Sequence, residues 1–179
     1  MEALDPHSAL IVVDLQAGTL GNAVVNPAEQ VVANATALVD VFRAAGLPVV
    51  LASVTGTPAG RTAYGVGARA FPAEFSALAI EPQPGDLVVQ RATWDAFAGT
   101  DLDAGLGALG VTQVVIVGVA TSFGVESTGR RAYDLGYSVV IVTDAISDPR
   151  AESHENSVTR VFPALGQLAT TPEVLALLA

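Results

Sequence analysis

Asp14 and Arg91 each directly follow a short apolar run that is typical of a buried strand. A third such run, Val114–Val117, ends in a turn at Gly118. Because open α/β sheets bind ligands at the carboxyl ends of their strands, we expect these three segments to meet at one site. A carboxylate there can move a proton, an arginine can pair with an anionic group, and the N–H groups of a turn before a helix can stabilise an oxyanion. The residues therefore predict a small-molecule site built around Asp14.

Each of these residues also has a plainer interpretation. A lone aspartate after a strand caps the chain more often than it catalyses, and Arg91 alone is compatible with a surface arginine. Near them, Trp94 and Phe97 are compatible with simple core aromatics.

Two residue types that carry much enzyme chemistry are absent. The chain has no cysteine, which excludes a thiolate nucleophile, disulfides and Cys-based metal sites. All eight basic residues are arginine, which excludes Schiff-base chemistry and a Walker lysine. His7 and His154 are the only histidines, too few for a metal site without several carboxylates. We expect neither a metal nor a cofactor.

The spacing of residues does not match the sequence motifs of two common classes of site, dinucleotide-binding sites and serine hydrolase sites. Neither Gly18-Thr-Leu-Gly21 nor Gly65-Val-Gly67 completes the dinucleotide-binding fingerprint. No Gly-x-Ser-x-Gly motif supports a serine hydrolase, and His154 lies in a predicted helix, where we interpret it as a packing or hydrogen-bonding residue.

Composition bounds the class of protein. A chain of 179 residues, 51% of them hydrophobic, predicts one domain spanning 1–179. The formal net charge of −10 argues against nucleic acid or an anionic membrane as a partner. No apolar run is long enough for a membrane span, and the acidic N-terminus lacks the features of a signal peptide. We therefore expect a cytoplasmic protein that acts on a small molecule.

The elements that must position these residues alternate between strand and helix, which indicates an α/β fold with a parallel sheet. The expected strands are Ala9–Val13, Pro48–Val54, Asp86–Gln90, Val114–Val117, Ser138–Thr143 and Gln167–Thr170. Helices are predicted at about 26–46, 100–110, 121–135 and 152–162 and from Thr171 onward. Thr121 or Ser122 is expected to cap the third of these helices.

Residues 55–84 are rich in Gly, Pro and Ala and too long for an ordinary connection. Two interpretations stay open: a solvated surface excursion, or a lid that supplies Arg61 or Arg69 to an anionic substrate.

Three sequence blocks resemble the isochorismatase-like (cysteine hydrolase) family, which includes nicotinamidases. They are Gly118-Val-Ala-Thr-Ser-Phe-Gly-Val-Glu-Ser-Thr128, Val12-Val-Asp-Leu-Gln16 and Gly85–Leu102. The resemblance covers about residues 8–179. It implies a three-layer, six-stranded, mainly parallel sheet in the order 3-2-1-4-5-6 with helices on both faces. It also implies a homodimer or homotetramer.

The same resemblance implies roles for individual residues. Most members of the family place a nucleophilic cysteine where this chain has Gly124 and a catalytic lysine where it has Arg91. Where nicotinamidases carry a metal-binding Asp-x-His motif, this chain has Ser53-Val-Thr55, which again predicts no metal. The resemblance implies a non-proline cis peptide at Val119–Ala120. It implies catalytic roles for Asp14 and Arg91, and substrate-binding roles for Gln16, Trp94, Phe97, Val119, Ala120, Phe123 and Gly124.

True isochorismatases resemble this chain in having glycine at the position of Gly124. By resemblance, their aspartate protonates an enol ether carbon and water captures the resulting cation. This predicts a hydrolase or lyase for a small carboxylate-bearing molecule, with Asp14 as acid or base and Arg91 as the carboxylate anchor. The alternative is a catalytically silent family member that serves as a binding or assembly scaffold. Arginine cannot relay protons as lysine can, and the sequence leaves open whether Arg91 or burial dominates the pKa of Asp14.

Overall fold

A six-stranded parallel sheet forms the centre of the protein. The computed structural model describes residues 3–21, 23 and 25–178. The sheet strands are β1 (Ser8–Val13), β2 (Val49–Val54), β7 (Leu87–Arg91), β8 (Gln113–Val119), β9 (Ser138–Ser147) and β10 (Gln167–Ala169). They lie in the order β10-β9-β8-β1-β2-β7, with every neighbouring pair parallel. In chain order this is 3-2-1-4-5-6, so the expected sheet is confirmed.

The central strands are apolar on both faces because helices cover both faces. Every residue of β1 and β8 is buried. Within β1, Ile11 and Val13 join one hydrophobic cluster while Leu10 and Val12 join the other. Successive side chains of a strand point to opposite faces, so a continuous apolar run is what a strand between two helical layers requires.

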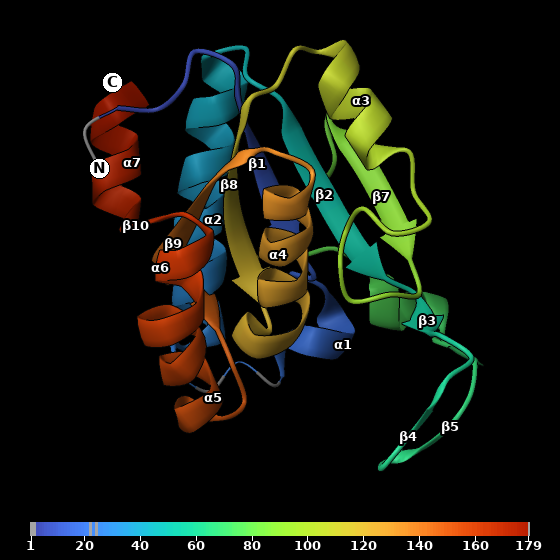
Figure 1. Cartoon of the computed structure of the whole chain (residues 1–179). Coiled ribbons are helices and arrows are strands. Elements are labelled where there is room, and N and C mark those ends of the chain that lie inside the picture. Colours follow the sequence, from blue (N-terminus) through green and yellow to red (C-terminus); the bar gives the residue numbers. More distant parts are fainter. Residues whose placement is uncertain (1–2, 22, 24, 179) are drawn as a thin grey trace.

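The helices form two layers (Figure 1). On one face, α2 (Ala28–Ala44) and α7 (Thr171–Leu178) contribute Leu38 and Val174 to the core. On the other, α3 (Leu102–Ala108), α4 (Glu126–Asp134) and α6 (Phe162–Leu165) contribute Leu106, Ala132 and Phe162. The described part of the chain also contains the short helices α1 (Ala17–Leu20) and α5 (Ala151–Asn156). None of the described helices combines the length and the apolar character that crossing a bilayer requires.

Residues 55–84 contain short elements that the sequence did not predict. Strands β3 (Gly56–Thr57) and β6 (Arg69–Ala70) pair antiparallel, as do β4 (Arg61–Thr62) and β5 (Gly65–Val66). The 3-10 turn η1 (Ala73–Ser76) then returns the chain to the body of the protein. Figure 1 shows the β4–β5 hairpin projecting beyond the rest of the molecule.

The helix predicted to begin near Thr121 starts with a π-helical turn, η2 (Thr121–Val125), which continues into α4. A second π-helical turn, η3 (Ser157–Val161), joins α5 to α6. The predicted cap is wrong: neither the Thr121 nor the Ser122 side chain caps the helix. Instead the carboxylate of Asp148 accepts the Ser122 backbone N–H at 2.8 Å.

Gly118 allows the ends of β1 and β8 to approach each other closely. Its φ is +124°, and a Cβ atom at this position would lie 1.9 Å from the Val13 carbonyl oxygen. No other residue type fits such a contact, because both the conformation and the space require glycine. The close approach brings Asp14, directly after β1, next to the turn that follows β8.

Candidate active site

A cavity of about 270 Å³ opens at the carboxyl ends of the central strands. Its wall contains one ionisable side chain among the described residues, that of Asp14. The other lining residues are Thr19, Val54, Gly56, Thr57, Pro58, Phe71, Phe75, Ala92, Trp94, Val119, Ala120, Phe123, Gly124 and Pro149. The cavity therefore lies at the sheet edge where the sequence predicted a site, and the segment 55–84 supplies one wall.

Asp14 and Arg91 form a buried bidentate ion pair. Arg91 Nη1 donates to Asp14 Oδ1, and Nη2 donates to Oδ2 at 2.9 Å. Nη2 also donates to the Trp94 carbonyl oxygen at 2.9 Å, and Nε donates to that of Asp95 at 3.3 Å. Every guanidinium nitrogen is thus bound to a protein acceptor, and the side chain is 2% exposed. Arg91 does not line the cavity, so in this arrangement it holds Asp14 and does not form the expected anchor for a substrate carboxylate.

The backbone of Asp14 has φ +52°, which is uncommon for a residue other than glycine. Its carbonyl oxygen accepts hydrogen bonds from the Thr19 hydroxyl and, at 2.9 Å, from the Gln16 N–H. These contacts hold the chain in a tight turn, so the carboxylate both faces the cavity and reaches Arg91.

Burial raises the pKa of Asp14 above its ordinary value, although the hydrogen bonds and the charge of Arg91 act in the opposite direction. Desolvation disfavours the charged carboxylate, while a neighbouring cation favours it. The competition that the sequence left open is therefore decided in favour of burial, and the shift is in the direction that a general acid needs.

Gly124 lies directly beside the Asp14 carboxylate. A Cβ atom at Gly124 would lie 3.0 Å from Asp14 Oδ2 and 3.0 Å from a methyl group of Val13. The peptide bond Val119–Ala120 is cis, as the resemblance implied. Glycine leaves a space next to the carboxylate that any larger side chain would reduce, and that space is available to a reacting atom.

Asp148 fixes the turn that carries Gly124, a role that sequence reasoning missed. Its side chain is fully buried and accepts hydrogen bonds from the Ser122 N–H at 2.8 Å and the Ser122 hydroxyl at 2.7 Å. It also accepts the Arg150 N–H at 3.0 Å. The contact joins positions that are far apart in the chain, and no local motif reports it.

Two aromatic pairs line the cavity. Trp94 and Phe123 meet edge to face with ring centroids 5.0 Å apart. Phe71 and Phe75 are tilted against each other at 4.3 Å. The sequence predicted the first pair as substrate-binding but missed Phe75, whose only signal was its place in an unusually long loop.

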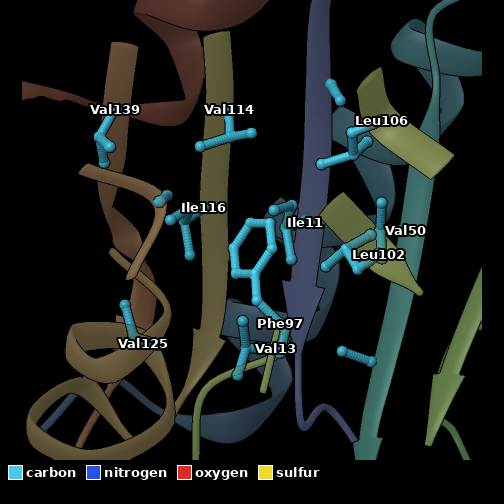
Figure 2. Close-up of a cluster of buried hydrophobic side chains, with 14 of the residues drawn as sticks. Ile11, Val13, Val50, Phe97, Leu102, Leu106, Val114, Ile116, Val125 and Val139 are labelled. Atoms are coloured by element: carbon cyan, nitrogen blue, oxygen red, sulfur yellow. The ribbon is translucent and has the colours of Figure 1, made fainter. Parts of the chain in front are cut away.

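Gln16 and Phe97 are not among the lining residues, although the resemblance gave both a substrate-binding role. The buried Gln16 amide donates to the carbonyl oxygens of Val54 and Phe75 and accepts the Val54 N–H. Phe97 is a core residue, and Figure 2 shows its ring beside Ile11.

His154 bonds to Thr121 and does not line the cavity, as expected for a hydrogen-bonding histidine. Its Nδ1 lies 2.9 Å from the Thr121 hydroxyl, and burial lowers its pKa. No group of three or more acidic or histidine side chains in the described residues is arranged to hold a metal ion.

Comparison with known proteins identifies the family. The isochorismatase domain profile matches residues 8–173. The chain is 38% identical over 178 residues to the isochorismatase family protein YwoC of Bacillus subtilis, covering 94% of this chain and 92% of that one. An isochorismatase family protein from Burkholderia thailandensis superposes with a TM-score of 0.93 at 38% identity, covering 98% and 97% of the two chains. Streptothricin hydrolase of Streptomyces noursei is 36% identical over 138 residues, which cover 76% of this chain and 48% of that protein. With a matching domain profile, a relative that is 38% identical over nearly the whole chain and a matching fold, the chain belongs to the isochorismatase family of hydrolases.

Proposed function

We propose that this protein hydrolyses a small molecule by adding water, with Asp14 as the proton donor and without a covalent enzyme intermediate. The favoured reaction is enol ether cleavage. The observation that carries the proposal is the position of Asp14, a buried carboxylate with a raised pKa that faces a cavity beside the open space at Gly124.

The reaction balances without a protein nucleophile. The Asp14 proton goes to the terminal carbon of the enol ether, and the resulting oxocarbenium ion is stabilised by the ether oxygen. Water then attacks the cationic carbon, and the hemiketal collapses to a ketone and an alcohol. Asp14 recovers its proton from water. The step needs an acid and space for the reacting carbon, which Asp14 and the room beside Gly124 can provide.

Arg91 supports this role by orienting the carboxylate. Its two parallel hydrogen bonds fix the plane of the Asp14 carboxylate, and its contacts to the carbonyl oxygens of Trp94 and Asp95 fix the guanidinium itself. Such preorganisation lowers the cost of aligning the acid with the substrate. In this proposal Arg91 is a positioning residue.

The names of the relatives support hydrolysis as the type of reaction, but they do not point to one particular substrate. One is named as a streptothricin hydrolase, and others as ureidoacrylate amidohydrolases. This chain lacks a cysteine, so an amide-cleaving version of the reaction would also need water as its nucleophile.

Solvent labelling tests the proposal. Purified protein is incubated in D2O with a panel of enol ethers and, separately, of simple amides, and the products are analysed by mass spectrometry. Carbon protonation places one deuterium on the former terminal carbon, whereas amide hydrolysis forms no carbon–deuterium bond. We expect turnover of an enol ether with that label. Turnover of amides alone would contradict the enol ether reaction while leaving water-based hydrolysis in place.

Asp14→Asn is the matching variant, because asparagine keeps an acceptor for Arg91 but cannot donate the proton. We expect a loss of turnover of about 10²–10⁴. Asp40→Asn, which changes an exposed aspartate on α2, is the control and should retain full activity. Melting temperatures of both variants establish that they fold.

The second candidate is a binding or assembly scaffold without catalysis. It is favoured by one observation, the complete engagement of both Asp14 oxygens by Arg91. Equal rates for the wild type and Asp14→Asn on every substrate would support it.

A further inference from the structure

The described wall of the cavity contains an acidic side chain but no basic one. Asp14 is the one ionisable side chain among its described lining residues, and Arg91 behind it has no nitrogen without a protein acceptor. A ligand carboxylate would give up its hydration, meet no cation and lie next to another carboxylate. Burying an anion without a partner is strongly unfavourable.

The arginines near the cavity do not change this. Arg150 follows the lining residue Pro149 and is exposed. Arg69 is also exposed, and its guanidinium carbon lies 5.7 Å from the centre of the Phe71 ring. Neither lines the cavity, so neither supports the earlier idea of a lid that brings an arginine to an anionic substrate.

The aromatic pairs favour a ligand that is neutral or positively charged. Trp94 with Phe123 and Phe71 with Phe75 present aromatic rings to the cavity. Ring faces carry partial negative charge, so they attract cations and the positive edges of flat, polar rings, and they repel anions. The negative charge of the whole chain acts in the same direction at longer range.

We propose that the cavity selects a flat, ring-bearing molecule that is neutral or cationic and rejects carboxylates, a substrate class that rests on the proposed function at the same site. The aromatic pairs hold the ring, and Asp14 with its dipolar ion pair receives the polar end. Specificity arises because the described lining residues include no free cation.

A charge series on one shape tests the inference. Benzoate, benzamide and benzamidinium share a ring and a flat head group and carry charges of minus one, zero and plus one. Dissociation constants are measured by calorimetry at pH 8 with the full chain. Benzamide and benzamidinium should each bind at least about tenfold more tightly than benzoate. Benzoate binding as tight as benzamide would overturn the inference.

Ala92→Lys supplies the missing cation at a lining position that is exposed, so the fold should tolerate it. We expect benzoate to bind at least about tenfold more tightly to this variant and benzamide to bind as before. Tyr64→Lys is the matched control, since it adds the same charge at a residue that is 91% exposed and outside the cavity. An equal gain in benzoate affinity in both variants would mean that general charge, and not the cavity, sets the preference.

The proposed ligand selectivity and the proposed reaction can be contradicted separately. A wild-type chain that turns over a carboxylate-bearing enol ether efficiently would overturn the substrate class but leave the mechanism intact. A chain that shows the predicted binding order and no turnover would contradict the mechanism and leave the selectivity standing.

Discussion

Asp14 combines two demands that usually conflict in one residue. In the proposed role of general acid it needs a raised pKa, and burial raises that pKa. As an oriented group it needs a fixed partner, and the bidentate Arg91 contact supplies that while pulling the pKa down. The pKa stays raised beside an arginine only if desolvation of the carboxylate is strong, which fits an Asp14 residue that is only 5% exposed.

The first prediction concerns pH. Because Asp14 must be protonated to act as the acid, kcat/KM should be highest below its pKa and fall as pH rises through it, by about tenfold per pH unit. The midpoint should lie above the usual aspartate value of about 3.9, because burial raises the pKa. A pH profile of kcat/KM on an active enol ether measures this. A profile that rises with pH would assign Asp14 as a base.

Gly124 is expected to matter because of the space beside it. Gly124→Ala would place a methyl group 3.0 Å from Asp14 Oδ2, which requires a small shift of the carboxylate and occupies the room for a reacting atom. We expect turnover to fall by at least about tenfold while stability changes by about 1 kcal/mol or less.

The control for this change is Gly107→Ala. Gly107 is exposed on α3 with open space around its missing Cβ, so alanine there should raise stability by about 0.5–1 kcal/mol and leave turnover alone. Chemical denaturation and steady-state kinetics on the two variants separate the effects. Unchanged turnover in Gly124→Ala would place the reacting atom elsewhere.

Sequence reasoning predicted several residues that line the cavity, but it did not predict their contacts. Asp14, Trp94 and Gly124 could be predicted because each follows a recognisable strand or block. The engagement of Arg91 could not, since it depends on the carbonyl oxygens of Trp94 and Asp95 folding back over the guanidinium. Asp148 was missed because its partner, Ser122, lies on a different element.

At the scale of elements, Gln16 connects the strand end that carries Asp14 to the aromatic wall of the cavity. Its side chain crosses from the turn after β1 to both backbone groups of Val54 at the end of β2 and to the Phe75 carbonyl oxygen in η1. One buried amide thus ties three segments together. Phe75 in turn lines the cavity, so the shape of the site depends on a residue that never touches it.

Gln16→Leu tests this connection. Leucine keeps the volume but leaves the Val54 N–H and the Phe75 carbonyl oxygen without the amide, while the Val54 carbonyl oxygen keeps the Ser76 hydroxyl as a donor. We expect a loss of about 2–4 kcal/mol of stability. Because the wall at Phe75 loosens as well, ligand affinity should weaken more than it does in Gln16→Glu, which keeps an acceptor for the Val54 N–H. Denaturant titration and calorimetry measure both quantities. A loss of stability with unchanged affinity would limit Gln16 to folding.

The strands were predictable because nearly every residue of the central ones is buried by a helix layer, which leaves an unbroken apolar signal. The strand ends and the π-helical turn η2 were not, because the spacing of apolar residues does not distinguish an i to i+5 turn from the α-helix that follows it. The ladders β3–β6 and β4–β5 have only two residues on each strand, too short for a period-two pattern.

At the scale of the whole molecule, the β4–β5 hairpin has little stability of its own. Only two residue pairs connect its strands. The hairpin carries Arg61 and Tyr64 in exposed positions and projects from the body of the protein (Figure 1). An isolated two-stranded hairpin is marginal in water. Residues 56–73 also contain no acidic residue in a chain with a net charge of −10, so the acidic surface of a second copy is a suitable partner.

The last prediction is therefore that the chain forms a homodimer or homotetramer through this hairpin. Size-exclusion chromatography with light scattering should give two or four times the chain mass at micromolar concentration. A double change of Arg61→Glu and Tyr64→Ser reverses the charge and removes the exposed ring, and it should shift the protein toward the monomer. Tyr133→Ser is the matched control, because Tyr133 is 53% exposed on α4, away from the hairpin. A monomeric wild type would exclude self-association. A variant that stays oligomeric would place the interface on another surface.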